Sequence, residues 1–352
     1  MNLDDLDHFK SLDPHGFLGQ IEALPDQVTA AWALGQSLTG EAVPDGFQGL
    51  TQIVIAGIGD AAIGGDLART LALPECPAPI SVWREFDPPS FVGAGTLVIA
   101  LSHSGNTVET LNVAEAALAR GAKVLAITTG GKLAVLAETE KAALWRYPHY
   151  GDARGAVGYL FLLPLAALVK LGFVADKSAE VVEAVEALKA QQARLRAESP
   201  VNRNPAKRMA GQIMDRLAAL FAGDYLLPVA RRWQGQINQV GKANCQVVAL
   251  SEVDHAVAGT VYPEQLVSKF MTLFFHAPSD APRTRRRCDA AHEIYMTSGF
   301  NTDVIDATGQ SPLAHMLTAL HFGDYTAYYL AMCYGVDPTP TPQIEYLKER
   351  MG

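Results

Sequence analysis

The chain has 352 residues, of which 49% are apolar and 18% are charged, and its formal net charge is −9. This composition indicates a compact globular protein, and the length allows one large domain or two smaller ones. The negative charge argues against a general nucleic-acid-binding protein, which needs a basic surface. No apolar run is long enough to cross a bilayer, and the acidic N-terminus MNLDDLDHFK does not resemble a signal peptide, so we expect a cytoplasmic protein.

The first half of the chain alternates between helix-like and strand-like segments. Residues 1–45 are predicted to be helical with a turn or kink near Pro25, and a buried strand that ends in glycines is predicted at 51–59. The next predicted elements are a helix at 62–73, strands at 79–85 and 96–102, a helix at 107–120 and a strand at 123–129. This order predicts a parallel sheet with helices on both faces.

The second half repeats the pattern after a polar, helical bridge around 175–205. The segment YLLPVA at 225–230 is predicted to begin a second unit. Its further predicted elements are strands within 245–252, 268–277 and 302–308 and a long helix at 311–335. The sequence therefore predicts an α/β protein with two subdomains that join near residues 155–205.

One basic run, RTRRR at 283–287, stands out in this acidic chain. We interpret it as a solvated loop or a partner contact, with a site for an anionic ligand as the alternative. The four cysteines, Cys76, Cys245, Cys288 and Cys333, are far apart and lack C-x-x-C spacing. They predict neither a zinc site nor a disulfide framework.

A loop rich in hydroxyl groups, SHSGNT at 102–107, lies between a predicted strand and a predicted helix. At such a junction, free backbone N–H groups and the positive end of the helix dipole favour an anion, most often a phosphate. Ser102, Ser104 and Thr107 can add hydroxyl donors, and Gly105 allows a close approach of the backbone. The loop is therefore a candidate phosphate site.

A plainer alternative is that this loop only caps the following helix. Asn106 and Glu109 have the spacing of a capping box. Three hydroxyl residues around a glycine favour phosphate binding over this alternative. The loop contains no Walker lysine and no G-x-G-x-x-G pattern, so a nucleotide is the weaker interpretation.

Several segments resemble one known family. SHSGNTVETL and ARGAKVLAITTGGKLA are similar to the sugar isomerase (SIS) domain, whose S-x-S-G-x-T loop binds the phosphate of a phosphosugar. AGIGDAAIGGDL resembles the first loop of that group, and NPAKRMA and RRWQGQINQVGK resemble its middle. The C-terminal HFGDYTAYYLAMCYGVDPTPTPQIEYLKER is long and specific. Together these segments resemble the bifunctional phosphoglucose/phosphomannose isomerase family.

The resemblance implies two SIS subdomains, each a doubly wound, flavodoxin-like parallel sheet flanked by helices. It also implies a homodimer, no metal and no organic cofactor, and isomerisation of glucose 6-phosphate or mannose 6-phosphate to fructose 6-phosphate through an enediol. A phosphorylated hexose would be the ligand, with no nucleic acid or membrane as partner. The expected domains are an N-terminal helical segment at 1–45, a first SIS subdomain at 46–154, a helical linker at 155–205 and a second SIS subdomain with C-terminal helices at 206–352.

The resemblance also implies roles for individual residues. Gly59 of the first loop and the residues of the SHSGNT loop would bind the phosphate. Arg154 would stabilise the enediolate, although a structural pairing with a carboxylate is the alternative. His255 would open the sugar ring, although a lone histidine is more often an ordinary structural side chain.

Four positions depart from the family pattern. Gln239 stands where the family has its glutamate base, and a primary amide cannot abstract a proton from carbon near neutral pH. In the first loop, Asp60 and Ala61 replace a glycine and a serine near the phosphate, and Gln310 replaces a usual lysine. Loss of a positioned general base lowers a rate by about 10²–10⁴.

Two hypotheses follow from these departures. The chain is a phosphohexose isomerase in which another group replaces the base, with Glu252, Asp254, His255 and His321 as candidates. Alternatively, it is a non-catalytic phosphosugar-binding or sensing protein. A DNA-binding regulator is discounted, because no helix-turn-helix segment with a basic face is evident. The isomerase is the preferred interpretation.

Overall fold

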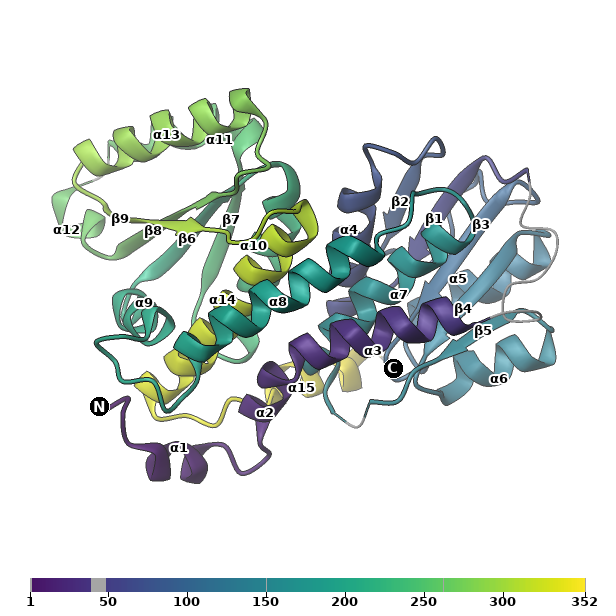
Figure 1. The fold of residues 1–352 in the computed structure, drawn as a ribbon, viewed down its shortest axis with the longest axis horizontal. Helices are drawn as coiled ribbons and strands as arrows, with labels where there is room; N and C mark the ends of the chain where they lie inside the picture. The colour runs from purple at the N-terminus through teal and green to yellow at the C-terminus, as the bar shows by residue number, and fades with distance from the viewer. Residues whose placement is uncertain (1, 39–48, 150, 262, 352) are drawn as a thin grey trace. The chain divides into compact units, whose positions relative to one another are not determined.

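The computed structural model describes residues 2–38, 49–149, 151–261 and 263–351. The chain forms two compact units, one made of residues 23–185 and the other of residues 1–22 and 186–352. We call them the β1–β5 unit and the β6–β9 unit after their sheets (Figure 1). The chain passes from the first to the second within the long helix α8, Ser178–Leu195.

The β1–β5 unit contains a five-stranded parallel sheet with the strand order β2-β1-β3-β4-β5. This is the flavodoxin-like order, which confirms the fold class predicted for this half. The strands are β1 Gln52–Ala56, β2 Ile80–Trp83, β3 Thr96–Leu101, β4 Lys123–Thr128 and β5 Ala143–Arg146. The helices are α3 Leu24–Ser37, α4 Asp60–Ala72, α5 Val108–Ala119, α6 Gly131–Thr139, the short 3₁₀-helix η2 Ala153–Gly155, and α7 Val157–Lys170.

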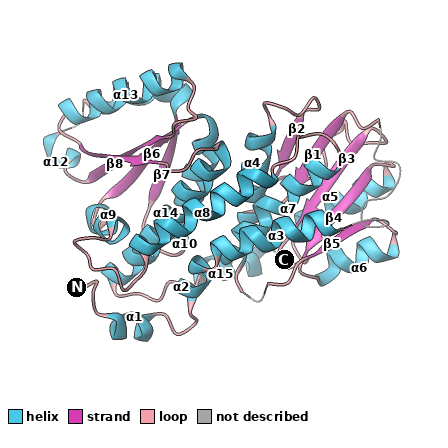
Figure 2. Cartoon of the chain, viewed as in Figure 1, coloured by secondary structure: helices cyan, strands magenta, loops and turns pink. Residues whose placement is uncertain are grey.

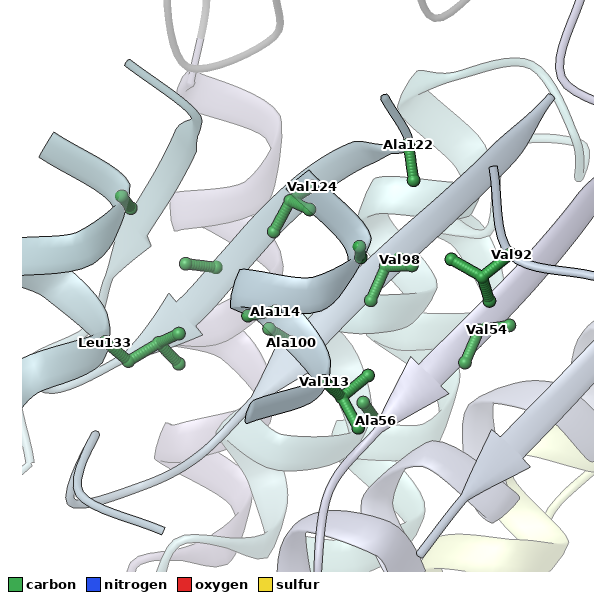
Figure 3. Packing of buried hydrophobic residues seen from close by; sticks show 13 residues of the cluster. Val54, Ala56, Val92, Val98, Ala100, Val113, Ala114, Ala122, Val124 and Leu133 are labelled. Atoms are coloured by element: carbon green, nitrogen blue, oxygen red, sulfur yellow. The ribbon is translucent and has the colours of Figure 1, made fainter. Parts of the chain in front are cut away.

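Small and β-branched residues form the core on one face of this sheet. Val54, Val98 and Val124 come from three neighbouring strands, and Val113 and Ala114 of α5 pack against them (Figure 3). Strand β3 is buried along its whole length. A strand covered on both faces needs a continuous apolar run, and TLVIAL supplies it.

The β6–β9 unit contains a four-stranded parallel sheet with the order β7-β6-β8-β9 (Figure 2). Its strands are β6 Leu217–Ala222, β7 Cys245–Ala249, β8 Phe270–His276 and β9 Asn301–Asp306. Its helices are α1 Leu6–Leu12, α2 Phe17–Glu22, α9 Pro205–Ile213, α10 Leu227–Gln239, α11 Val253–Val257, α12 Glu264–Val267, α13 Pro282–Thr297, α14 Pro312–Tyr334 and α15 Pro342–Met351. Short 3₁₀-helices lie at Asp224–Leu226, Leu250–Glu252 and Ala258–Thr260.

The buried helix α14 joins two of the sequence segments that carry the family resemblance. Arg232 of α10 forms a buried, two-pronged ion pair with Asp324 of α14, with both N–O distances at 3.0 Å. The indole of Trp233 donates to the carbonyl of Ala319 at 2.8 Å. A Cβ at Gly323 would lie 2.2 Å from that indole, so no other residue fits there. The RRW and GDY segments are therefore needed for packing.

Most of the predicted elements are confirmed within a few residues, but two interpretations are wrong. YLLPVA does not begin the second unit, because strand β6 precedes it and YLLPVA itself forms a 3₁₀-turn and the start of α10. RTRRR at 283–287 is not a loop but lies in the first turns of α13. There Arg285 donates to the carbonyl of Ala277 and Arg287 to that of Leu250, so two of its arginines bind the protein itself. Within the described residues, no helix is both long and apolar enough to span a membrane.

His321 of α14 is a fully buried core residue and not a candidate base. Its Nε2 atom donates to the carbonyl of Ile21 at 3.0 Å, and burial lowers its pKa from 6.5 to about 4. Below pH 6.5 the unfolded chain takes up a proton that the folded chain excludes, so stability falls as the pH falls towards 4. Between pH 7 and 4.5 this one group is expected to cost about 2–3 kcal/mol of unfolding free energy.

The variant His321→Gln tests this expectation, because glutamine can keep the bond to Ile21 and does not titrate. Urea unfolding at pH 7 and at pH 4.5 should show a smaller loss of stability in this variant than in the parent chain. His255→Gln, at an exposed position, is the matched control and should leave the loss unchanged. Equal losses in all three proteins would show that His321 does not contribute.

Candidate active site

The strand order of the β1–β5 sheet places its topological switch point at the carboxyl ends of β1 and β3. In sheets of this kind the chain leaves these two central strands in opposite directions, and ligands bind at that point. The loop after β1 contains Gly57 and Gly59, and the loop after β3 is the SHSGNT segment. The fold therefore brings the two loops predicted to hold phosphate to the same edge of one sheet.

Hydroxyl groups organise the SHSGNT loop internally. The hydroxyl groups of Ser102 and Thr107 lie 2.9 Å apart, and the Ser102 hydroxyl also accepts from the N–H of Gly105 at 3.1 Å. The hydroxyl of Ser104 accepts from the N–H of Asn106 at 3.2 Å. Ser102 is buried while Ser104 is exposed, so Ser102 shapes the loop and Ser104 is available to a ligand.

Hydrogen bonds from the segment after β4 hold the SHSGNT loop in place. The carbonyl of His103 accepts from the N–H and the hydroxyl of Thr129, at 3.1 and 2.7 Å, and the carbonyl of Gly105 accepts from the N–H of Leu133 at 2.8 Å. Among the described residues, the N–H groups of Ser104 and Thr107 have no acceptor. Bound carbonyls and unused N–H groups are the arrangement that an anion needs.

The predicted capping box is wrong. Thr107, not Asn106, is the residue that precedes α5, and no side chain caps this helix. The side-chain oxygen of Asn106 accepts instead from the N–H of Lys132 at 3.1 Å. Asn106 therefore ties the phosphate loop to α6, and the first N–H groups of α5 are left without a side-chain cap. This removes the plainer interpretation of the loop.

The first loop places a carboxylate close to the phosphate loop. Gly59 is exposed and has a φ of +57°, a left-handed conformation that favours glycine, and Asp60 begins α4. Asp60 is near enough to raise the pKa of His103 electrostatically, although burial outweighs this and the net pKa shift of His103 is downward. A carboxylate at a helix N-terminus is stabilised by the helix dipole. Asp60 thus reduces the positive potential that a phosphate would meet here.

His103 connects the phosphate loop to the segment after β5. Its Nε2 atom lies 2.9 Å from the carbonyl of Gly151, so it must donate, and its Nδ1 atom lies 3.0 Å from the hydroxyl of Tyr147. Burial lowers the pKa of His103 and so favours the neutral imidazole, in which Nδ1 accepts from that hydroxyl. The ring of His149 packs edge-on against His103 at 5.4 Å between centroids.

Arg154 lies at the end of this network in η2. Its side chain is 7% exposed and pairs with the carboxylate of Asp152 at 2.6 Å. Asp152 follows Gly151, whose carbonyl His103 holds. Asp152 holds the guanidinium of Arg154 in one orientation. This geometry agrees with the structural pairing and also with the catalytic role expected for Arg154.

The other sequence-predicted residues belong to the β6–β9 unit. Gln239 is the half-buried last residue of α10, and Gln310 is exposed. His255 lies on α11 with 87% of its side chain exposed, and its Nε2 atom is 3.8 Å from the carboxylate of Glu252. Asp254 is exposed beside it. The structure describes these positions within their own unit only, so their roles stay predictions.

The equivalent edge of the second sheet is not suited to phosphate. Asp224 follows β6 and accepts from the N–H of Ala281 at 3.0 Å, and Asp280 follows β8 and accepts from the N–H of Ala277 at 2.7 Å. Burial raises the pKa of Asp280, with the nearby Asp224 acting in the same direction. The carboxylates of Asp224 and Asp280 thus already accept from N–H groups that would otherwise be available to an anion. Among the described residues, the SHSGNT loop of the first sheet therefore stays the candidate phosphate site.

Residues outside the SHSGNT segment support the loop and were not predicted from the sequence. Thr129 and Gly131 after β4 and Tyr147 after β5 are not in the SHSGNT segment, yet they contact it. The signal for the first two is the pair of glycines in TTGG directly after a strand, which marks a close backbone approach. No metal site was predicted, and no group of three or more metal-ligating side chains occurs in the described part of the chain.

Comparison with known proteins agrees with this geometry. A family profile described as the bacterial phospho-glucose isomerase C-terminal SIS domain matches residues 202–351, and the SIS domain profile matches residues 51–142. A bifunctional phosphoglucose/phosphomannose isomerase of Caldicellulosiruptor bescii is 35% identical over 333 residues, which cover 94% of this chain and 97% of that protein. The chain belongs to the bifunctional phosphoglucose/phosphomannose isomerase family. A relative of the same name from Aquifex aeolicus is 32% identical and covers 85% of this chain and 90% of its own length.

Solved structures show that the family fold extends over the chain. A glucose-6-phosphate isomerase like protein of Thermus thermophilus matches with a TM-score of 0.61 at 21% identity, covering 97% of this chain and 98% of that one. The tagatose-6-phosphate ketose/aldose isomerase of Escherichia coli matches with a TM-score of 0.69 at 16% identity, covering 92% and 94%. At these identities the likeness concerns the fold, and it confirms the two SIS-type sheets that the sequence predicts.

Proposed function

We propose that this chain is a phosphohexose isomerase that interconverts glucose 6-phosphate or mannose 6-phosphate with fructose 6-phosphate. The observation that carries the proposal is family membership over nearly the whole chain, and the internal hydrogen bonds of the SHSGNT loop support it. Non-catalytic phosphosugar binding is the less favoured function, because it rests on substitutions alone. A homodimer and a cytoplasmic location stay predictions from the resemblance.

The phosphate of the sugar would anchor at the SHSGNT loop. The N–H groups of Ser104 and Thr107, the exposed Ser104 hydroxyl and the uncapped start of α5 can all donate to it. Each hydrogen bond to a charged group contributes about 1.5–3 kcal/mol. Such an anchor holds the sugar while leaving C1 and C2 free to react.

The isomerisation needs no external oxidant or reductant, because the two carbons exchange oxidation states. A base removes the proton from C1 of the ketose, the electron pair forms the C1–C2 double bond, and the C2 carbonyl oxygen gains negative charge. The C2 oxygen takes up a proton to give the enediol, O1 loses its proton as the C1 carbonyl forms, and proton return to C2 then gives the aldose. We propose that Arg154 stabilises the charged oxygen, because a buried guanidinium in fixed orientation acts strongly on developing charge.

The base is the open part of this proposal. Gln239 cannot serve, and His321 is sealed in the core. His103 uses both ring nitrogens in hydrogen bonds. Glu252, Asp254 and His255 are exposed on their unit and remain candidates.

The proposal is tested by incubating the purified chain with fructose 6-phosphate in D₂O and following the sugar by proton NMR. We expect glucose 6-phosphate or mannose 6-phosphate to appear, or deuterium to enter at C1. Calorimetric titration with the same sugar phosphate provides the control for binding. Binding without either product or exchange would show a phosphosugar-binding protein and overturn the isomerase.

His103 is expected to be a positioning residue that acts through Arg154. The variant His103→Phe keeps an aromatic ring but loses the bonds to Tyr147 and Gly151. The segment carrying Arg154 should then shift, and kcat should fall about 10- to 100-fold, whereas KM for fructose 6-phosphate changes little. His103→Gln, which can both donate and accept, should recover part of the kcat. An increase in KM with unchanged kcat would show that His103 acts only on the phosphate loop.

A further inference from the structure

A pocket that the proposed reaction does not use lies in the β6–β9 unit. It has a volume of about 820 Å³ and is formed by the end of α8, the segment 196–203 and the start of α9. Four arginines line it, namely Arg194, Arg196, Arg203 and Arg208. Glu198 is the one carboxylate in its lining. We call this site the arginine pocket.

The protein neutralises only part of the positive charge of the arginine pocket. All four arginines are exposed, and among the described residues Arg194, Arg203 and Arg208 form no ion pair. Arg196 lies near Glu22 and lowers the pKa of that carboxyl, although burial raises it more. In a chain of net charge −9, this concentration of unpaired cations needs an explanation.

A buried polar framework fixes the backbone that carries these arginines. The side chain of Asn204 is buried, donates to the carbonyls of Leu195 and Arg196 at 2.9 and 3.1 Å, and accepts from the N–H groups of Ala206 and Lys207 at 3.0 and 3.1 Å. It therefore links the end of α8 directly to the start of α9.

Lys207 completes the framework from the other side. Its buried ammonium donates to the carbonyl of Ala197 at 2.7 Å and pairs with Asp4 at 3.0 Å. Asp4 also accepts from the N–H of Val201 at 2.9 Å. The segment between α8 and α9 is thus held at both ends and in its middle. Because the backbone is already fixed, binding of an anion has to order only the arginine side chains and not the segment that carries them.

We propose that the arginine pocket binds a small ligand with at least two phosphate groups, such as a bisphosphorylated sugar or a nucleoside polyphosphate. Guanidinium groups match phosphate oxygens in two-pronged hydrogen bonds. The volume of the pocket lies in the range of about 300–1,000 Å³ that is usual for small-molecule sites. The four arginines and Glu198 give the lining a net charge of +3, so one phosphate dianion would leave positive charge unmatched, whereas a diphosphate can match all of it.

The first experiment titrates the full chain with inorganic pyrophosphate by isothermal calorimetry, in the presence of saturating fructose 6-phosphate to occupy the phosphate loop. We expect one pyrophosphate to bind per chain. Separate titrations with fructose 1,6-bisphosphate and with ATP then show whether a bisphosphorylated sugar or a nucleoside polyphosphate binds more tightly. No binding of pyrophosphate at millimolar concentration would overturn the proposal. The measurement does not depend on catalysis, so a chain without isomerase activity can still give the expected result.

Paired variants separate a built site from general charge attraction. Arg203→Gln with Arg208→Gln should weaken pyrophosphate binding at least about tenfold for each arginine removed. Arg283→Gln with Arg286→Gln makes the same change of charge at two exposed positions of α13 and should leave the affinity nearly unchanged. Equal weakening by both pairs would show a response to net charge only and would contradict the proposal. Thermal unfolding of each variant verifies that it is folded.

Discussion

Replacement of Gln239 by glutamate is expected to raise the rate of isomerisation by about 10²–10⁴, the contribution of a positioned general base. The change exchanges an amide for a carboxylate of nearly the same shape. Gln239 is half-buried at the end of α10, where a negative charge costs only about 0.3–1 kcal/mol against the helix dipole. The measurement is kcat for the conversion of fructose 6-phosphate to glucose 6-phosphate, with deuterium exchange at C1 as a second readout.

The variant Gln246→Glu is the matched control for this gain. It makes the same chemical change at an exposed position on β7 and should not alter the rate. An unchanged rate in Gln239→Glu as well would show that another group of this chain already acts as the base. Substitution of Glu252, Asp254 and His255 in turn would then identify it, since loss of that group should remove the exchange at C1.

The fold of the β1–β5 unit could be predicted closely because its strands follow simple rules. Strands β1 and β3 are β-branched, continuously apolar runs bounded by glycine and polar residues, as buried parallel strands require. The helix α5 shows apolar spacing and ends at Ala119, and Gly121, which has a positive φ, follows its C-cap residue Arg120. Each of these local signals agrees with the tertiary structure.

Strand β6 could not be identified in the same way. Its sequence LAALFA contains three alanines and no β-branched residue, and it has the composition of a helix. It is a strand because its residues pair on both sides, with β7 and with β8. Pairing with the neighbouring strands therefore overrides the helical preference of this sequence. The start of the unit was predicted instead at the adjacent apolar segment YLLPVA. The proline in that segment stands in the first turn of α10, where proline is favoured.

The part of the candidate site that lies in one loop could be predicted from the sequence, whereas the part formed by several distant segments could not. The SHSGNT loop combines its signals within six residues, and its internal hydrogen bonds agree with a phosphate site. The bonds from His103 to Tyr147 and Gly151 join positions more than forty residues apart. Neither His103 nor Tyr147 lies in a local sequence pattern that indicates such a contact. The capping box failed because Asn106 binds Lys132 of another helix instead of its own.

The variant Gly105→Ala is expected to abolish useful phosphate binding. Gly105 has a φ of +66°, and a Cβ there would lie 1.8 Å from the carbonyl oxygen of Gly130 and 2.8 Å from the hydroxyl of Thr128. Backbone atoms cannot yield as a flexible side chain does, so the loop must move away from the segment after β4. Loss of two or more charge-assisted hydrogen bonds should weaken binding of fructose 6-phosphate by at least about 10²-fold. Calorimetric titration with that sugar phosphate measures the effect.

The variant Gly121→Ala separates the steric contact from the backbone strain. Gly121 has a φ of +75° in the same unit, yet a Cβ there would meet no atom within 4 Å. It should lose about 1–2 kcal/mol of unfolding free energy from the left-handed conformation and bind the sugar phosphate normally. If Gly105→Ala also bound it normally, the SHSGNT loop would not be the phosphate anchor. Since both variants carry the same type of backbone strain, a difference between them in affinity can only come from the shape of that loop.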